Sequence, residues 1–320
     1  MLNEENGLTW GTKRYHTLNW EMRNHFGHKV FKISLDAGFT CPNRDGKLSD
    51  LGCLFCSPRG SGDFAGDRAL DLPSQFAQVK AIMHKKWPQG KYIAYFQAFS
   101  NTYARVEQLR ELYEFAINQP DVIGLAVATR PDCIPENVLS LLAELNQKTY
   151  LWVELGLQTI HKKTADLMNL HYDFTVFNQT LYALQNQNIQ TVAHIILGLP
   201  GESHDDMRQT GEELSKLPIQ GLKIHLLHLM KDTPLAQIYA KKTFPYLTQA
   251  EYVDLVVDIL EKMPRHVVIH RLTGDSPRNT LIGPTWSLNK WEVLNSIDSR
   301  LNQRQTWQGR LAADKHIGGY

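Results

Sequence analysis

Cysteine is scarce in this sequence, which has only four cysteines among 320 residues. So few cysteines cannot form the disulfide framework that holds small secreted proteins together. Long apolar runs are also missing, since no stretch approaches the roughly 18 residues that a membrane-spanning helix needs. The first residues lack the basic-then-apolar layout of a secretory signal peptide. We therefore expect a cytoplasmic protein without a membrane partner.

An excess of charge of one sign is missing as well, because the net charge is +1 at pH 7. Hydrophobic residues make up 42% and charged residues 21% of the chain, which is typical of a folded globular protein. The near balance hides two basic stretches. Residues 11–34 contain five Lys or Arg against one Glu, and residues 265–320 contain eight Lys or Arg against four Asp or Glu. Such stretches are compatible with a polyanionic partner, although each alone could equally be a solvated face.

Short runs rich in β-branched and aromatic residues alternate with longer segments of helical spacing. We expect strands over residues 29–34, 92–98, 123–128, 149–157, 190–197 and 222–229. We expect helices between them over residues 73–87, 105–118, 135–147, 174–187 and 203–216. This alternation requires parallel strands with right-handed crossovers, in a doubly wound sheet or a barrel. Six units favour an α/β fold of the partial (βα)6 TIM barrel type.

The pattern changes beyond Lys231. Residues 267–272 could form an extra strand, and further helices are expected over residues 235–241, 248–262 and 287–305. No linker rich in Pro, Gly or Ser is long enough to separate two domains. We therefore divide the chain into an N-terminal basic segment (1–24), a core barrel (25–264) that includes a cysteine loop (37–71), and a C-terminal extension packed on the barrel (265–320).

Three of the four cysteines lie in the run DAGFTCPNRDGKLSDLGCLFCS, which follows the first expected strand. Cys41, Cys53 and Cys56 have the spacing C-x11-C-x2-C, and Gly46 and Gly52 let the connecting loop fold back. Three thiolates can hold a [4Fe-4S] cluster and leave its fourth iron free for another ligand. The spacing therefore predicts that the three cysteines converge on one metal centre.

The same cysteines could instead hold zinc, with a histidine such as His28 or His84 as the fourth ligand. The chain would then be a non-catalytic, zinc-stabilised protein that binds nucleic acid. Spacing alone does not decide between zinc and an iron–sulfur cluster. The fourth cysteine, Cys133 in RPDCIP, is interpreted as a small packing residue and not as a ligand.

The cysteine run and four later motifs resemble the radical S-adenosylmethionine (SAM) superfamily. Within it they are similar to the YtqA/YhcC-like group, also called MnmL-type, which is related to the catalytic subunit of Elongator. Most of the superfamily has three residues in the first gap, but a long gap preceded by DAGFTCPNRDG is typical of this branch. Phe55 matches the aromatic residue that the superfamily has before its third cysteine. The resemblance implies a radical SAM barrel with a [4Fe-4S] cluster and SAM as cofactors.

The later motifs lie at the ends of expected strands. FQAFSNTY stands where the superfamily usually has Gly-Gly-Glu, and it lacks both glycines and the acid. ATRPD, WVELGLQT, HIILGLPGES and LKIHLLHLMKDT follow in the order of the family. The resemblance implies that Arg130 faces the SAM carboxylate and that Glu154 and Gln158 face its amino and ribose groups. The full set of implied SAM contacts is Gln97, Ser100, Asn101, Arg130, Glu154 and Gln158.

The resemblance also implies a reaction and its partners. A 5′-deoxyadenosyl radical would abstract hydrogen from a tRNA, and the carboxymethylaminomethyl side chain of its wobble uridine would become an aminomethyl group. A reducing protein such as flavodoxin or ferredoxin would supply the electron. No catalytic residue is assigned. Four residues that could face the barrel interior or contact substrate have open roles: His194, His225, His228 and Arg271.

Overall fold

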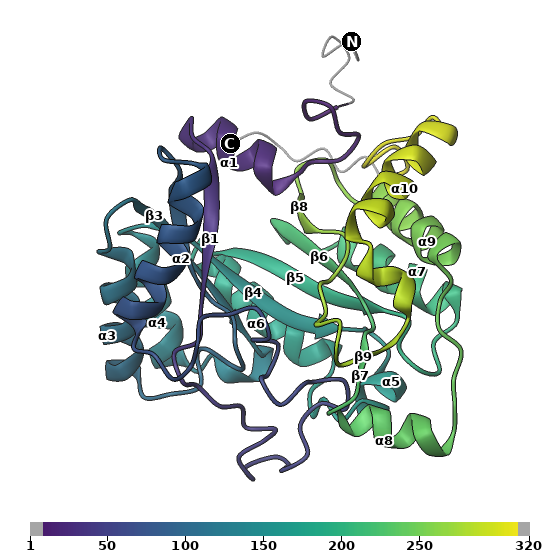
Figure 1. The fold of residues 1–320 in the computed structure, drawn as a ribbon, viewed down its shortest axis with the longest axis horizontal. Coiled ribbons are helices and arrows are strands. Elements are labelled where there is room, and N and C mark those ends of the chain that lie inside the picture. The colour runs from purple at the N-terminus through teal and green to yellow at the C-terminus, as the bar shows by residue number, and fades with distance from the viewer. Residues whose placement is uncertain (1–8, 313–320) are drawn as a thin grey trace.

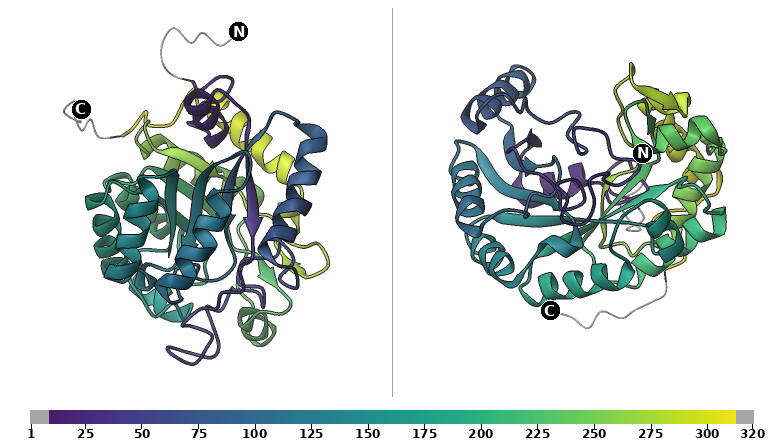
Figure 2. Two further views of the ribbon diagram at one scale, coloured as in Figure 1. Left: turned by 90° about the vertical axis from the view of Figure 1, so that its left-hand side faces the viewer. Right: turned by 90° about the horizontal axis from the view of Figure 1, so that it is seen from below.

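Seven parallel strands form one curved sheet in the computed structural model, which describes residues 9–312. Each strand pairs in parallel with its neighbour, in the order β1-β2-β3-β4-β5-β6-β8. The strands are β1 (Val30–Leu35), β2 (Lys91–Phe96), β3 (Val122–Thr129), β4 (Tyr150–Gln158), β5 (Gln190–Leu197), β6 (Gly221–Leu226) and β8 (Val268–Arg271). The sheet curls into part of a barrel with helices on its outer face (Figures 1 and 2). The expected partial barrel is therefore confirmed.

Helices follow the strands and cover the outer face of the sheet (Figure 2). The helices in the described residues are α1 (Leu18–Phe26), α2 (Leu72–Lys86), α3 (Val106–Ile117), α4 (Glu136–Asn146), α5 (Lys162–Leu167), α6 (Phe174–Asn186), α7 (His204–Ser215), α8 (Pro234–Lys241), α9 (Gln249–Lys262) and α10 (Lys290–Gln303), with short 3-10 helices η2 (Pro131–Cys133) and η3 (Thr285–Leu288). Of these, α1 precedes β1 and α8 lies at the opposite end of the barrel (Figure 1). Local sequence fixes several helix ends. Ser203 and Thr248 are the N-caps of α7 and α9 and form capping boxes. In each, the N-cap hydroxyl accepts from the backbone N–H three residues later, and the carboxylate of that residue accepts from the N-cap backbone N–H.

Side chains on each strand alternate between the helix layer and the barrel interior. In β4, Leu151, Val153 and Leu155 are buried in the core beneath the helices, whereas Trp152 packs in a separate interior cluster. Glu154 shares the inward face and is buried. A buried acid needs partners inside the protein, because an unpaired charge is costly to desolvate.

The expected strands form close to their expected bounds, with one exception at the end of the sixth. Residues 222–229 were expected as one strand, but β6 ends at Leu226. The chain then turns, and β7 (Leu229–Met230) pairs antiparallel with β9 (Leu281–Gly283). The extra strand over residues 267–272 does form, as β8, and it extends the parallel sheet beside β6.

Two helices were not expected from the sequence. α1 has 9 residues and α5 has 6, so each is too short to show a clear helical period. Local signals for α1 were nevertheless present, since Thr17 caps its first turn and Gly27 ends it in a left-handed conformation.

The two ends of the described chain lie against each other. The backbone N–H of His16 donates to Gln308 Oε1 at 2.8 Å, and Thr17 bridges to Ile269 of β8. The proposed segments 1–24 and 265–320 are therefore in contact where they are described, and their outermost residues, 1–8 and 313–320, lie outside the described part. Within residues 9–312 no helix is both long and apolar enough to cross a membrane.

Candidate active site

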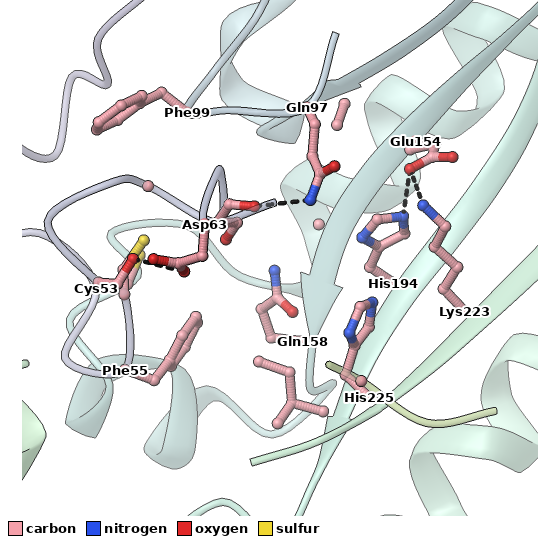
Figure 3. Close-up of a pocket in the computed structure, with 18 of the residues that line it drawn as sticks. Cys53, Phe55, Asp63, Gln97, Phe99, Glu154, Gln158, His194, Lys223 and His225 are labelled. Atoms are coloured by element: carbon pink, nitrogen blue, oxygen red, sulfur yellow. Dashed lines mark hydrogen bonds and ion pairs between the residues drawn. The ribbon is translucent and has the colours of Figure 1, made fainter. Parts of the chain in front are cut away.

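A cavity of about 430 Å³ opens at the carboxyl ends of the strands. Its walls come from β1 to β6, from the cysteine loop and from residues 271–277 after β8. In Figure 3, Cys53 and Phe55 lie on one side of the view, and Glu154 and Lys223 lie on the other. Parallel α/β barrels place their chemistry at this end, so the cavity is the candidate active site.

The cysteine loop is held in place by Arg44. Cys41, Cys53 and Cys56 all line the cavity. Arg44 Nη2 donates to the carbonyl oxygen of Cys56 at 2.7 Å and to that of the following residue at 2.8 Å. Gly52 has a φ of +78°, and a Cβ there would lie 2.8 Å from Arg44 Nε. Glycine is therefore required at this position by both the backbone and the packing.

A second anchor ties the loop to the turn after α5. Asn43 Nδ2 donates to the carbonyl oxygen of Asn169 at 2.6 Å, and Asn169 Nδ2 donates to that of Gly52 at 2.7 Å. The backbone N–H of Leu54 donates to the Met168 carbonyl at 3.0 Å. These bonds hold the loop at the mouth of the barrel.

Burial governs the chemistry of the thiols. It raises the pKa of Cys53 to about 12, with a further contribution from Cys56 and an opposing one from Arg130. Burial also raises the pKa of Cys56, against the effect of Arg44. Thiolate is the form of cysteine that binds metals, and metal binding displaces the proton. A cationic metal centre would therefore be needed to keep these side chains ionised at neutral pH.

Cys41, Cys53 and Cys56 lie around one cavity. The ligands of a cubane bind separate irons and surround the cluster, so cysteines placed around a cavity can hold it. Among the described residues, no group of three His, Cys, Asp or Glu side chains is arranged to hold a single metal ion. Cys133 is buried in η2 and does not line the cavity.

The structure brings most of the expected SAM contacts to this cavity. Those that line it are Gln97, Ser100, Arg130, Glu154 and Gln158. Asn101 is fully buried and does not line it. Its side-chain Nδ2 donates to the carbonyl oxygen of Ala128 at 2.7 Å. Its backbone carbonyl oxygen accepts a hydrogen bond from the Tyr113 hydroxyl. In this structure Asn101 therefore supports the end of β3.

Hydrogen bonds hold the Arg130 guanidinium in place through two of its three nitrogens. Its Nε and Nη2 donate to the Asp132 carboxylate at 2.8 and 2.7 Å, and its guanidinium stacks 4.7 Å from the centre of the Tyr172 ring. Burial alone would lower the pKa of Arg130, but the hydrogen bonds to Asp132 raise it, so the side chain stays charged. Its Nη1 is buried and has no hydrogen-bond partner in the described part of the chain. This donor is available to an anion in the cavity.

Glu154 is saturated by protein partners on the inner side of the cavity. Its carboxylate is surrounded by the side chains of Lys32, Tyr95, Trp152, His194 and Lys223. The Tyr95 hydroxyl donates at 2.7 Å, Trp152 Nε1 donates at 3.0 Å, and His194 Nε2 lies at 3.1 Å. A carboxylate offers about four lone pairs, so little capacity remains for a ligand. That Glu154 contacts SAM stays a prediction.

The charge of Glu154 follows from the same network. Burial alone would raise the pKa of Glu154, but the ammonium groups of Lys223 and Lys32 lower it well below its usual value. Burial lowers the pKa of His194 to about 4, and Lys223 adds to that shift. The inner side of the cavity thus holds an ionised acid, neighbouring ammonium groups and a neutral imidazole.

Sequence reasoning missed four members of this network: Lys32, Tyr95, Trp152 and Lys223. Lys32 and Lys223 stand within the apolar strand sequences VFKISL and GLKIHL. A lysine is almost never fully buried unless it is paired. The signal was therefore available, since a lysine inside a buried parallel strand predicts an acidic partner across the barrel.

Comparison with known proteins agrees with this geometry. The model of the radical SAM superfamily matches residues 46–214, and that of the Radical_SAM C-terminal domain matches residues 219–303. YtqA of Bacillus subtilis is 54% identical over 93% of this chain and 93% of its own length. YhcC of Escherichia coli K12 is 34% identical over 88% of this chain and 91% of its own length.

A solved structure has a similar fold. Elp3 of the archaeon Methanocaldococcus infernus, with an N-terminal deletion, superposes with a TM-score of 0.64 and 15% sequence identity. The similarity covers 87% of this chain, which spans 64% of that protein. At this identity the likeness concerns the fold alone.

Proposed function

This chain belongs to the radical SAM superfamily, and we propose that it holds a [4Fe-4S] cluster on Cys41, Cys53 and Cys56 and cleaves SAM there. One observation carries the proposal: the three cysteines line the same cavity as five of the six implied SAM contacts. When bound, the cluster would supply the electron that breaks a carbon–sulfur bond of SAM and releases a 5′-deoxyadenosyl radical.

The protein groups around the cavity fit this chemistry. The free Nη1 of Arg130 can donate to the SAM carboxylate in a charge-assisted hydrogen bond. Gln97 and Gln158 line the wall and lie in Figure 3 between the cysteine loop and the inner side. Buried apolar surface near the cysteines, including Leu54 and Leu227, limits the access of water to a reactive intermediate.

For the substrate we propose tRNA, with conversion of the carboxymethylaminomethyl group of the wobble uridine to an aminomethyl group. In this step SAM is the oxidant and becomes methionine and 5′-deoxyadenosine. The bond between the amine nitrogen and the carboxymethyl carbon breaks with uptake of one water, and the two carbons leave as glyoxylate. The support is the resemblance of the motifs to the MnmL-type group. The N-terminal stretch lies largely at the amino ends of the strands, opposite the cavity, because α1 precedes β1 (Figure 1). Lys13 and Arg14 there contact Asp298 and Asn302. The modified side chain that enters the cavity would instead meet inward cations such as Lys32 and Arg271.

Mass spectrometry of tRNA nucleosides tests this substrate. Cells that lack the protein are expected to accumulate the carboxymethylaminomethyl form. Incubation of that tRNA with cluster-loaded protein, SAM and a reductant is expected to yield the aminomethyl nucleoside together with 5′-deoxyadenosine. The control is the Cys41→Ala variant, which should yield neither product. Identical wobble nucleosides with and without active protein would reject tRNA as the substrate but not the SAM chemistry.

A further inference from the structure

Unpartnered polar atoms gather on one wall of the cavity. His225 Nε2, His228 Nε2 and Ser276 Oγ are each buried without a hydrogen-bond partner among residues 9–312, and all three residues line the cavity. Buried polar atoms are normally paired, because an unmade hydrogen bond costs about 1–3 kcal/mol. Three of them on one wall therefore point to a ligand that completes their bonding.

The wall is built from two segments that pack closely. His225 lies on β6 and His228 follows it, while Ser276 belongs to the segment after β8. A Cβ at Gly274 would lie 3.0 Å from His228 Cε1 and 3.9 Å from His225 Nδ1. The His194 and His225 rings lie 5.3 Å apart between centroids, which connects this wall to the Glu154 network. The donors therefore have fixed positions.

The charge near this wall is positive. Lys32, Lys223 and Arg271 line the cavity, and the carboxylates that face them are Glu154 and Asp275. Glu154 pairs with both lysines. Asp275 lies 3.6 Å from Arg271, but its shorter ion pair, at 2.8 Å, is with Lys290. Asp275 therefore engages Arg271 only weakly, and the Arg271 guanidinium can bind an anion that enters the cavity.

The anion at this wall is distinct from the SAM carboxylate. Arg130 Nη2 donates to the Leu170 carbonyl at 2.9 Å, and Leu170 packs in the same apolar cluster as Cys53, so Arg130 lies on the cysteine side of the cavity. Cys53 and His225 lie on opposite sides of the view in Figure 3, with Gln158 between them. A SAM molecule bound at the cysteines through Arg130 would leave the far wall to the substrate.

We propose that Arg271, His225, His228 and Ser276 form a subsite that binds a carboxylate of the substrate. This inference rests on the proposed function, since the carboxymethylaminomethyl group ends in a carboxylate. A guanidinium can bind a carboxylate through two parallel hydrogen bonds, and imidazole N–H and hydroxyl donors complete its coordination. The subsite would hold the end of the side chain while its reacting carbon faces the cofactor side of the cavity.

The first test compares two tRNAs that differ only in the carboxymethyl group that carries this carboxylate. Anaerobic holoenzyme with SAM is titrated with tRNA that carries the carboxymethylaminomethyl or the aminomethyl side chain, and binding is followed by fluorescence anisotropy. Wild type is expected to prefer the carboxylate form by about tenfold or more, the scale of a charge-assisted hydrogen bond. Arg271→Gln and the milder Ser276→Ala are expected to reduce this preference without weakening binding of the aminomethyl tRNA.

A matched control distinguishes a carboxylate subsite from a general attraction between the protein and RNA. Arg278→Gln removes one positive charge from the same segment at an exposed position that does not line the cavity, and it should keep the preference. If Arg271→Gln weakens both tRNAs equally, the side chain contacts an RNA phosphate. If it weakens SAM binding and leaves the preference intact, the subsite belongs to SAM. Either result overturns the proposal. An unchanged preference for the carboxylate form in both Arg271→Gln and Ser276→Ala would also overturn it.

A second test does not depend on tRNA. Protein labelled with ¹⁵N-histidine and loaded with cluster and SAM is titrated with sodium acetate, against sodium chloride at equal ionic strength. Acetate alone is expected to shift the imidazole signals of His225 and His228, and Arg271→Gln should abolish the shift. An acetate response with no discrimination between the tRNAs would reject the proposed tRNA substrate but keep the carboxylate subsite. The absence of an acetate response in wild type would reject the subsite itself.

Discussion

Glu154 has five protein groups around its two carboxylate oxygens and is fully buried. The network joins residues from β1, β2, β4, β5 and β6, so it ties the strands together across the barrel interior. Such a network is stable only while its charges match, because an isolated ion inside a protein is costly. Its energetic role can therefore be tested apart from catalysis.

Glu154→Gln is expected to destabilise the cluster-free protein by about 3–5 kcal/mol, because it leaves the Lys223 ammonium buried and uncompensated. Urea unfolding followed by circular dichroism measures the change. The double variant Glu154→Gln, Lys223→Met should recover part of the loss, since it removes both charges. A single variant within about 0.5 kcal/mol of wild type, the range of ordinary surface changes, would show that the network does not stabilise the fold.

Arg130 is the second residue whose role can be measured alone. Arg130→Ala is expected to weaken SAM binding by about 1.5–3 kcal/mol, the usual size of a hydrogen bond to a charged group. Isothermal titration of anaerobic holoenzyme with SAM provides the value. Arg110→Ala is the control, because Arg110 pairs with Glu144 on the outer helices and does not line the cavity. Unchanged affinity in Arg130→Ala would mean that the SAM carboxylate binds elsewhere.

The cysteine loop behaves as an element whose shape depends on one glycine. Gly52→Ala should displace the loop, because alanine disfavours a φ of +78° and its Cβ would meet Arg44. We expect the Gly52→Ala variant to lose most of its iron, while its free energy of unfolding in urea falls by only about 1–2 kcal/mol. Gly27→Ala is a matched control, since Gly27 has a φ of +69° with open space around it. Full iron content in Gly52→Ala would contradict the account of the loop.

The elements of the core followed from local sequence more readily than those at its edges. Residues 190–197 are a β-branched run between helical segments, and they form β5 at the expected bounds. α5 was missed because six residues make fewer than two helical turns. It is held by the packing of Ala165 and Met168 in one cluster with Leu54 and Leu227. The turn that ends β6 at Leu226 was missed because it depends on pairing with β9, more than fifty residues later.

At the scale of the whole molecule, the site also has one part that the sequence predicts and another that it does not. The cysteine spacing is contained in one loop, so Cys41, Cys53 and Cys56 could be grouped from sequence alone. The partners of Glu154 come from several strands, and their meeting depends on the curvature of the sheet and on which face of each strand is inward. Lys32 and Lys223 are 191 positions apart in the sequence. No local pattern predicts that they share one carboxylate.

The buried histidines give the whole protein a pH dependence. Burial lowers the pKa values of His194 and His228 to about 4 and also lowers those of His225 and His270. The unfolded chain then binds protons below about pH 6.5 that the folded chain does not, so stability falls as the pH falls from about 6.5 toward 4. The pKa of Glu154 is lowered in the folded protein, so its ionised form stabilises the fold at all pH values above about 4.5, which is its pKa in the unfolded chain. This stabilisation is lost as the pH falls below that value.

Urea unfolding of the cluster-free protein between pH 7 and pH 5 measures this dependence. Below pH 6.5, each buried histidine lowers the free energy of unfolding by up to about 1.4 kcal/mol for each pH unit. His228→Asn should reduce the slope, whereas His84→Asn, at an exposed position, should leave it unchanged. A stability that is flat over this range would show that the imidazoles are accessible to protons in the folded state.

The central claim is that Cys41, Cys53 and Cys56 hold a [4Fe-4S] cluster at which SAM is cleaved. The direct measurement is metal content and 5′-deoxyadenosine formation by anaerobically reconstituted protein with SAM and dithionite. Wild type and Cys133→Ala are expected to bind about four irons per chain, absorb near ~400 nm and release 5′-deoxyadenosine. Alanine at any of the three cavity cysteines should abolish both iron binding and cleavage. Bound zinc in place of iron, or full iron content in a cavity variant, would contradict the account.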